Sequence, residues 1–151
     1  MTEPSVRDIA YTFISEGIAK ADLAVFDAVL SEEIVVETGL HPQGPILGRE
    51  AYKQIFAAFA DAWPVQRFEI HTVVAEGNRV AIQFTATTVF EKDYYGVAAT
   101  RQIVPLREIH LLTVAGGRIV HNTVAGVNFP FEYIMYPVLK DLVLGPLETI
   151  A

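Results

Sequence analysis

Residues 97–128 read VAATRQIVPLREIHLLTVAGGRIVHNTVAGVN, and this stretch decides the fold. Apolar and polar side chains alternate on both sides of Ala115-Gly116-Gly117, whose small residues are typical of a tight hairpin turn. The pattern predicts two long antiparallel strands, over residues 97–114 and 118–128. Pro105 has no backbone N–H, so it indicates a bulge or an edge position in the first strand.

Two more strands are expected just before this hairpin. Residues 68–75 alternate, Gly77-Asn78 is a turn signal, and residues 79–90 alternate again. A second turn is expected over residues 93–96. Short connections of this kind favour antiparallel pairing, so the second half of the chain predicts a four-stranded antiparallel sheet.

The first half of the chain is predicted to be mostly helical. A helix is expected over residues 5–20, where Ser5 and Asp8 have the spacing of a capping box. Asp22 is expected to cap a short second helix, and a short strand is expected over residues 34–38.

A loop with three glycines and two prolines is expected over residues 39–48, followed by a third helix over 49–62. This helix has the strongest helical periodicity in the chain, carried by Tyr52, Ile55, Phe56, Phe59 and Trp63. The order of elements predicts one α+β domain over residues 1–151, with three N-terminal helices packed on a curved antiparallel sheet around a hollow.

The last segment, residues 129–151, is too rich in aromatic and aliphatic side chains for a disordered tail. A helix is expected over about residues 132–144, interrupted at Pro137. We expect the segment to cover or narrow the pocket entrance. The alternative is packing against the outer surface of the helices or at an interface.

The composition is apolar, with 52% hydrophobic residues, 19% charged residues and a mean hydropathy of +0.34. No run approaches the roughly 18 apolar residues of a membrane-spanning helix. The apolar surplus therefore indicates a cavity, a homodimer interface, or both. The net charge of −7 and the scattered Lys and Arg residues argue against nucleic-acid binding.

Several other classes of site are not indicated. The chain has no cysteine, and its four histidines lack metal-binding spacing, so no metal site is expected. No GxGxxG or phosphate-binding loop is present, so no cofactor is expected either. The N-terminus lacks a basic stretch followed by an apolar run, from which we expect a cytoplasmic protein.

Three quoted stretches together resemble a known superfamily: ADL at 21–23 followed by LSEEIVVE at 30–37, GREAY at 48–52, and EIHLLTVAGGRIV at 108–120. In order and spacing they resemble NTF2-like (cystatin-like) proteins, and among these the SnoaL-like and ketosteroid-isomerase-like groups. The resemblance implies a cone-shaped α+β domain that binds a small molecule. The same fold hosts isomerases, cyclases, dehydratases and binding proteins, so it does not specify a reaction.

The catalytic positions of these relatives hold other residues here. The isomerase base falls at Thr38, its oxyanion-hole tyrosine at Ile14, and its oxyanion-hole acid at Ile109, next to Glu108. The acid of SnoaL-type cyclases falls within residues 124–128, VAGVN, which contain none.

His110 and Arg107 are the candidate catalytic residues. His110 shares a strand face with Glu108, and a carboxylate beside an imidazole can orient it for proton exchange. Arg107 lies on the opposite face with Ile109 and Leu111, which the resemblance implies is concave, and it could bind a carboxylate or enolate there. The alternatives are a hydrogen-bonded histidine at a dimer face and an arginine paired with a surface acid.

The other candidates are expected to line the pocket. An amide such as that of Asn122 can donate to a ligand carbonyl, and residues where a strand enters a loop often contribute to binding sites. The predicted ligand-binding residues are Tyr11, Phe13, Thr38, Phe56, Phe59, Trp63, Leu111, Asn122, Val124 and Asn128.

These observations support one leading hypothesis: a small, largely apolar, carbonyl-bearing molecule is bound and undergoes proton transfer, as in isomerisation, cyclisation or dehydration. The acid/base residue would be His110 if its face is concave. A ligand carrier or protein-association module without catalysis is the alternative.

Overall fold

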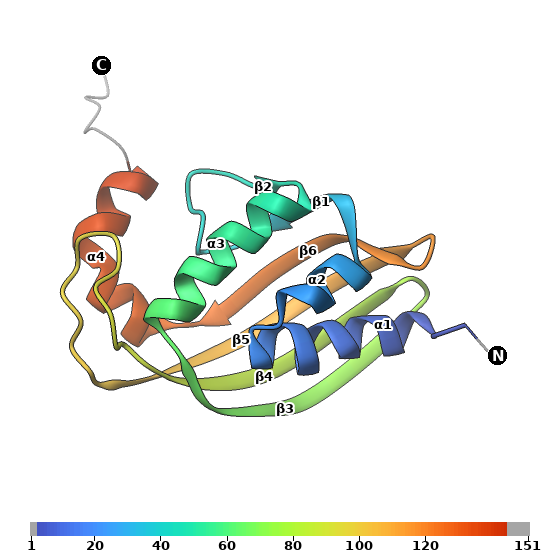
Figure 1. Ribbon diagram of the computed structural model, residues 1–151, viewed down its shortest axis with the longest axis horizontal. Coiled ribbons are helices and arrows are strands. Elements are labelled where there is room, and N and C mark those ends of the chain that lie inside the picture. The colour runs from blue at the N-terminus through green and yellow to red at the C-terminus, as the bar shows by residue number, and fades with distance from the viewer. Residues whose placement is uncertain (1–2, 145–151) are drawn as a thin grey trace, which may run out of the picture.

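The computed structural model describes residues 3–144, which form helices on one side of a curved, unclosed sheet (Figure 1). The fold is α+β and NTF2-like, as predicted. In chain order the elements are α1 (Val6–Thr12), η1 (Phe13–Ile18), α2 (Leu23–Val29), β1 (Leu30–Glu37), β2 (Ile46–Leu47), α3 (Arg49–Ala62), β3 (Val65–Glu76), β4 (Arg79–Val89), β5 (Ile103–Ala115), β6 (Arg118–Val127) and α4 (Phe129–Leu144).

The sheet has the strand order β2-β1-β6-β5-β4-β3. Strands β3 to β6 pair antiparallel through short turns, as the alternation predicts, whereas β1 pairs parallel to β6. The expectation of a wholly antiparallel sheet is therefore wrong at this edge. The reason is topological, because α3 and four strands separate β1 from β6 in sequence.

Local capping starts the helices where the sequence predicts. The Ser5 hydroxyl accepts from the Asp8 N–H, the Asp8 carboxylate accepts from the Ser5 N–H, and the Asp22 carboxylate accepts from the Ala24 N–H. The first helix is not a uniform α-helix, since residues 13–18 form a π-helix. Helix α3 spans residues 49–62, as predicted.

Strand β5 begins at Ile103, later than the predicted start at residue 97. Residues 97–102 belong to a loop that is closed by two backbone hydrogen bonds between Phe90 and the 101–102 pair. Arg101 has a φ of +60°, which is incompatible with extended backbone, so β5 starts only at Ile103. Pro105 pairs with Thr87 of β4 in a part of β5 that has no β6 partner, which is the predicted edge position.

Helices α1, η1, α2 and α3 cover the face of the sheet that carries the core (Figure 1). Trp63 is fully buried at the end of α3 and stacks on Phe90 with a centroid separation of 4.1 Å. Phe131 of α4 packs edge-on against Trp63 at 5.0 Å and against Phe59 at 5.8 Å. These contacts dock α4 at the end of α3. Pro137 lies within α4, which runs from Phe129 to Leu144, so the expected interruption at this proline is wrong. The predictions for residues 145–151 lie outside the described residues.

No helix within residues 3–144 is long and apolar enough to cross a membrane.

Candidate active site

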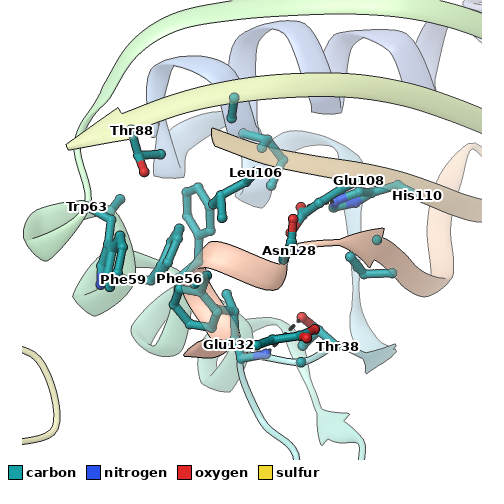
Figure 2. A pocket seen from close by; sticks show the side chains of 18 of the residues that line it. Thr38, Phe56, Phe59, Trp63, Thr88, Leu106, Glu108, His110, Asn128 and Glu132 are labelled. Carbon is teal, nitrogen blue, oxygen red and sulfur yellow. Dashed lines mark hydrogen bonds and ion pairs between the residues drawn. The ribbon is translucent and has the colours of Figure 1, made fainter. Parts of the chain in front are cut away.

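A cavity of about 790 Å³ lies between the helices and the inner face of the sheet (Figure 2). The ends of η1 and α3, the loop after β1, the inner faces of β4, β5 and β6, and helix α4 all contribute to its lining. Most lining side chains are apolar, and aromatic rings form much of the wall: Phe56, Phe59, Trp63, Phe68, Phe84 and Phe131. A cavity of this size and character is suited to a small, largely apolar molecule.

Strand β5 sends one set of alternating side chains into this cavity. Leu106, Glu108 and His110 belong to the lining, whereas Arg107 and Ile109 are exposed on the other face. Period-two alternation therefore places the carboxylate and the imidazole on the ligand side of the sheet. Figure 2 shows Glu108 and His110 side by side, with Asn128 next to them.

Glu108 is held from two sides. His110 Nε2 lies 3.2 Å from one carboxylate oxygen, and Asn128 Nδ2 donates to the other at 2.9 Å. The Asn128 side chain is itself fixed, because its Oδ1 accepts the backbone N–H of Arg107 at 2.9 Å. The Glu108 side chain is 19% exposed and that of His110 only 4%, so the carboxylate is the more accessible member of the pair.

His110 connects the carboxylate to a second polar pair deeper in the core. Its Nδ1 lies 3.0 Å from Asn122 Nδ2, and Asn122 Nδ2 lies 3.4 Å from the Tyr52 hydroxyl. The imidazole also packs against the ring of Phe84, at 5.2 Å between centroids. These contacts form one continuous polar chain from helix α3 to strand β5.

Tyr52 remains a neutral phenol in this environment. Burial raises the pKa of its hydroxyl well above the ordinary value; the hydrogen bond to Asn122 lowers it by a smaller amount, and the nearby charge of Glu108 raises it slightly. A neutral phenol of this kind can donate a hydrogen bond at neutral pH.

Gly126 allows the carboxylate and its partners to approach closely. It pairs with Glu108 across β5 and β6, and a Cβ at this position would lie 2.7 Å from the Arg107 carbonyl oxygen. The same Cβ would lie 3.1 Å from Asn128 Nδ2. Only glycine therefore fits beside the carboxylate without displacing a neighbour.

Other polar groups occur farther along the cavity. The Thr88 hydroxyl is buried and donates to the Val104 carbonyl at 2.7 Å, so its oxygen can still accept. Lys20, Glu132 and Lys140 are exposed members of the lining and mark its solvent-facing rim. Within residues 3–144, no three His, Asp or Glu side chains come together as a metal site would require.

The structure places seven of the predicted site residues in the cavity lining: Thr38, Phe56, Phe59, Trp63, His110, Val124 and Asn128. Asn122 and Phe13 are fully buried beside it but do not line it. Other residues of η1 and β6 line the cavity instead.

The placement of Arg107, Leu111 and Tyr11 at the pocket is wrong. Arg107 and Leu111 point outward because the inner face of β5 carries the set that contains His110. Tyr11 is 39% exposed and lies in a surface groove between the α1–η1 segment and β3.

Glu108 and Tyr52 are not among the predicted site residues, yet both line the cavity. Sequence analysis gives Glu108 only as the carboxylate that could orient His110, and Tyr52 only as part of the helical periodicity of residues 49–62. The signal for Glu108 was present in the sequence, since it alternates in phase with His110.

The family model for the SnoaL-like domain matches residues 12–122, most of the chain. The protein belongs to the SnoaL-like family. Among solved structures, a proposed SnoaL-like polyketide cyclase from Jannaschia sp. CCS1 is similar, with a TM-score of 0.73, 17% identity, and coverage of 94% of this chain and 93% of that one.

Two further structures show the same fold. IdmH, a proposed polyketide cyclase from Streptomyces antibioticus, has a TM-score of 0.72, 17% identity, and coverage of 87% of this chain and 99% of its own. An NTF2-like protein from Burkholderia thailandensis E264 has a TM-score of 0.70, 17% identity, and coverage of 89% and 98%. No curated protein matches this SnoaL-like sequence significantly.

Proposed function

We propose that the protein binds a small, largely apolar, carbonyl-bearing molecule in its cavity and catalyses proton transfer on it, with Glu108 and His110 as the acid/base pair. The observation that carries this proposal is the hydrogen-bonded carboxylate–imidazole pair on the wall of an aromatic cavity. The family and the polyketide cyclase names of its structural neighbours support a substrate with several carbonyl groups.

The proposed reaction begins at a carbon next to a carbonyl group. The Glu108 carboxylate removes a proton from that carbon, so that the C–H bond breaks, an O–H bond forms on Glu108, and the electron pair moves to the carbonyl oxygen as an enolate. Attack of the enolate carbon on a second carbonyl of the same molecule then forms a ring. The proton on Glu108 passes to the new alkoxide and restores the carboxylate.

The surroundings support this role. His110 and Asn128 hold the two carboxylate oxygens, so Glu108 is fixed before a substrate arrives. A substrate that fills this largely apolar cavity would displace water from it, which strengthens electrostatic interactions at the reacting atoms. Arg107, the other residue predicted to be catalytic, points away from the cavity and has no part in this reaction.

The test uses a probe with an acidic C–H group, such as an aryl-substituted β-keto thioester, in deuterated buffer. NMR measures the exchange of its α-protons with and without the protein. We expect exchange above the buffer rate, and a fall of about 10²–10⁴-fold in Glu108→Gln. His110→Gln should reduce the rate as well. Arg107→Gln is the matched control on the opposite face of the same strand and should exchange like the wild type.

Binding is measured separately through the fluorescence of Trp63, the only tryptophan in the chain and part of the cavity wall. Probe binding without accelerated exchange would identify a ligand carrier and overturn the catalytic proposal. Equal exchange by Glu108→Gln and Arg107→Gln would overturn the assignment of the base.

A further inference from the structure

The polar chain Tyr52–Asn122–His110–Glu108 joins three elements, α3, β6 and β5, through polar contacts of 3.0–3.4 Å. Tyr52, Asn122 and His110 are almost entirely buried. Their donors and acceptors must therefore be paired mainly within the protein, and the positions of the protons follow from which groups can donate and which can accept.

The orientation of the Asn128 amide is fixed by its backbone partner. The backbone N–H of Arg107 can only donate, so the atom that faces it must be the amide oxygen of Asn128. The Asn128 NH2 group therefore faces Glu108 and donates to it. The second carboxylate oxygen faces His110 Nε2.

Three proton arrangements of the Glu108–His110 pair satisfy that contact. The imidazole is neutral with its proton on Nε2, or it is protonated on both nitrogens, or it carries its proton on Nδ1 while Glu108 is protonated. The last two both place a proton on Nδ1. The group that faces Nδ1, the amide of Asn122, therefore distinguishes them from the first.

In the observed orientation, Asn122 directs its NH2 group at both neighbours, His110 Nδ1 and the Tyr52 hydroxyl oxygen. Both N–H groups then have acceptors, and only the Asn122 amide oxygen lacks a partner among residues 3–144. The reversed amide would instead bury an NH2 group at that position, with two donors unpaired. A buried donor without a partner is rarer than an under-satisfied carbonyl, so the observed orientation is favoured.

We propose that Asn122 is a positioning residue that keeps His110 as the neutral imidazole with its proton on Nε2, and leaves the Tyr52 hydroxyl free to donate into the cavity. Tyr52 accepts from Asn122 through its oxygen, and no residue within 3–144 accepts its own proton. Tyr52 lines the cavity together with Glu108. One amide thus gives the site a base, Glu108, and a hydrogen-bond donor, Tyr52.

The catalytic role of the Tyr52 hydroxyl rests on the proposed function. A carbonyl substrate would direct its oxygen at the Tyr52 hydroxyl and its acidic carbon at Glu108, so the donor would stabilise the enolate that the base creates. The titratable groups that face His110 are Glu108 on its own strand and Tyr52 through Asn122, while Phe84 covers it from β4.

The test is the protonation of His110, measured by NMR on protein with 15N-labelled histidine near pH 7. His110→Gln identifies the signals. We expect one unprotonated nitrogen, Nδ1, and one protonated nitrogen, Nε2. A proton on Nδ1 in the wild type, in either the neutral or the cationic form, would overturn the proposal.

Variants of Asn122 test the cause. Asn122→Asp offers only acceptors, so it should move a proton onto Nδ1, whereas Asn122→Leu should leave a mixture of tautomers. Thr123→Val, on the next residue and the opposite face of β6, should leave the wild-type signals unchanged. An unchanged His110 in folded Asn122→Asp and Asn122→Leu would show that Asn122 does not position it. Should neither variant fold, the wild-type spectrum alone decides.

Tyr52→Phe tests whether the Tyr52 hydroxyl acts as a hydrogen-bond donor to the substrate. It should lower probe exchange by about 10²-fold while the Trp63 binding signal persists. An equal exchange rate in this variant would refute the role of Tyr52. A wild type without any exchange would refute the proposed function but would leave the His110 spectrum to be decided on its own.

Discussion

Gly126→Ala is the smallest change that should disturb the site directly. Gly126 lies opposite Glu108 in the β5–β6 pair, and its φ is not in the left-handed region, so alanine meets no backbone restriction there. The new Cβ would lie 2.7 Å from the Arg107 carbonyl oxygen and 3.3 Å from Glu108 Cγ. The effect of this substitution is therefore steric and local.

The distances set the expected magnitude. To reach an ordinary contact, the two strands must separate by roughly 0.7 Å at this point, a shift that costs about 1–3 kcal/mol in a packed site. Replacing glycine returns about 0.4–1 kcal/mol through the unfolded chain. We expect a net loss near 1–2 kcal/mol, or a urea midpoint lower by roughly 0.5–1 M. Glu108 and His110 would both move with β5, away from their 2.9 Å and 3.0 Å contacts with Asn128 and Asn122.

Urea unfolding and the 15N signals of His110 measure the two effects. Gly39→Ala is the matched control, because Gly39 also lines the cavity but a Cβ there meets nothing within 4 Å. That variant should stay within about 0.5 kcal/mol of the wild type. If Gly126→Ala is as stable as Gly39→Ala and leaves the His110 signals unchanged, the close approach of β5 and β6 does not hold the carboxylate in place.

Three other predictions concern pH, assembly and the C-terminal helix. Burial raises the pKa of Tyr52 above its usual 10.0, so its contribution to stability is complete below about pH 10 and is lost as the pH rises further; Tyr52→Phe should lose less stability than the wild type between pH 10 and 12 in urea unfolding. Ile109 and Leu111 are 43% and 37% exposed on the outer sheet face, so we expect a homodimer there that Ile109→Asp disrupts in sedimentation velocity; a wild-type monomer at micromolar concentration would reject it. Truncation after Asn128 removes α4. If α4 is a lid, the truncated protein should release the bound probe faster while its sheet stays folded; a loss of stability alone would show that α4 is only a packing element.

Much of the fold could be read from local sequence signals, because those signals act over a few residues. The capping box at Ser5 and Asp8, the Asp22 cap, and the helix over residues 49–62 all depend on neighbours within one or two turns. The turn at Gly116-Gly117 fixes the β5–β6 hairpin in the same way, since both glycines adopt positive φ values.

Features that depend on contacts between distant residues could not be predicted from the sequence. The parallel pairing of β1 with β6 joins segments more than 80 residues apart, and the loop over residues 97–102 depends on the positive φ of Arg101 and on its hydrogen bonds to Phe90. Residues 97–102 carry no local sequence signal that distinguishes them from the strand that follows. Tertiary contacts therefore decided where β5 begins.

The candidate site shows the same division. Alternation alone determined that Glu108 and His110 share one face of their strand and that Arg107 lies on the other. It could not determine which face is concave, because period two is the same for both sides of a sheet. Only the packing of the helices against that sheet chose the face, and only folding brought Tyr52 and Asn122, 70 residues apart, within 3.4 Å of each other. The residue types were written in the sequence, but the contacts that determine their proton positions arise from elements that meet only in the folded chain.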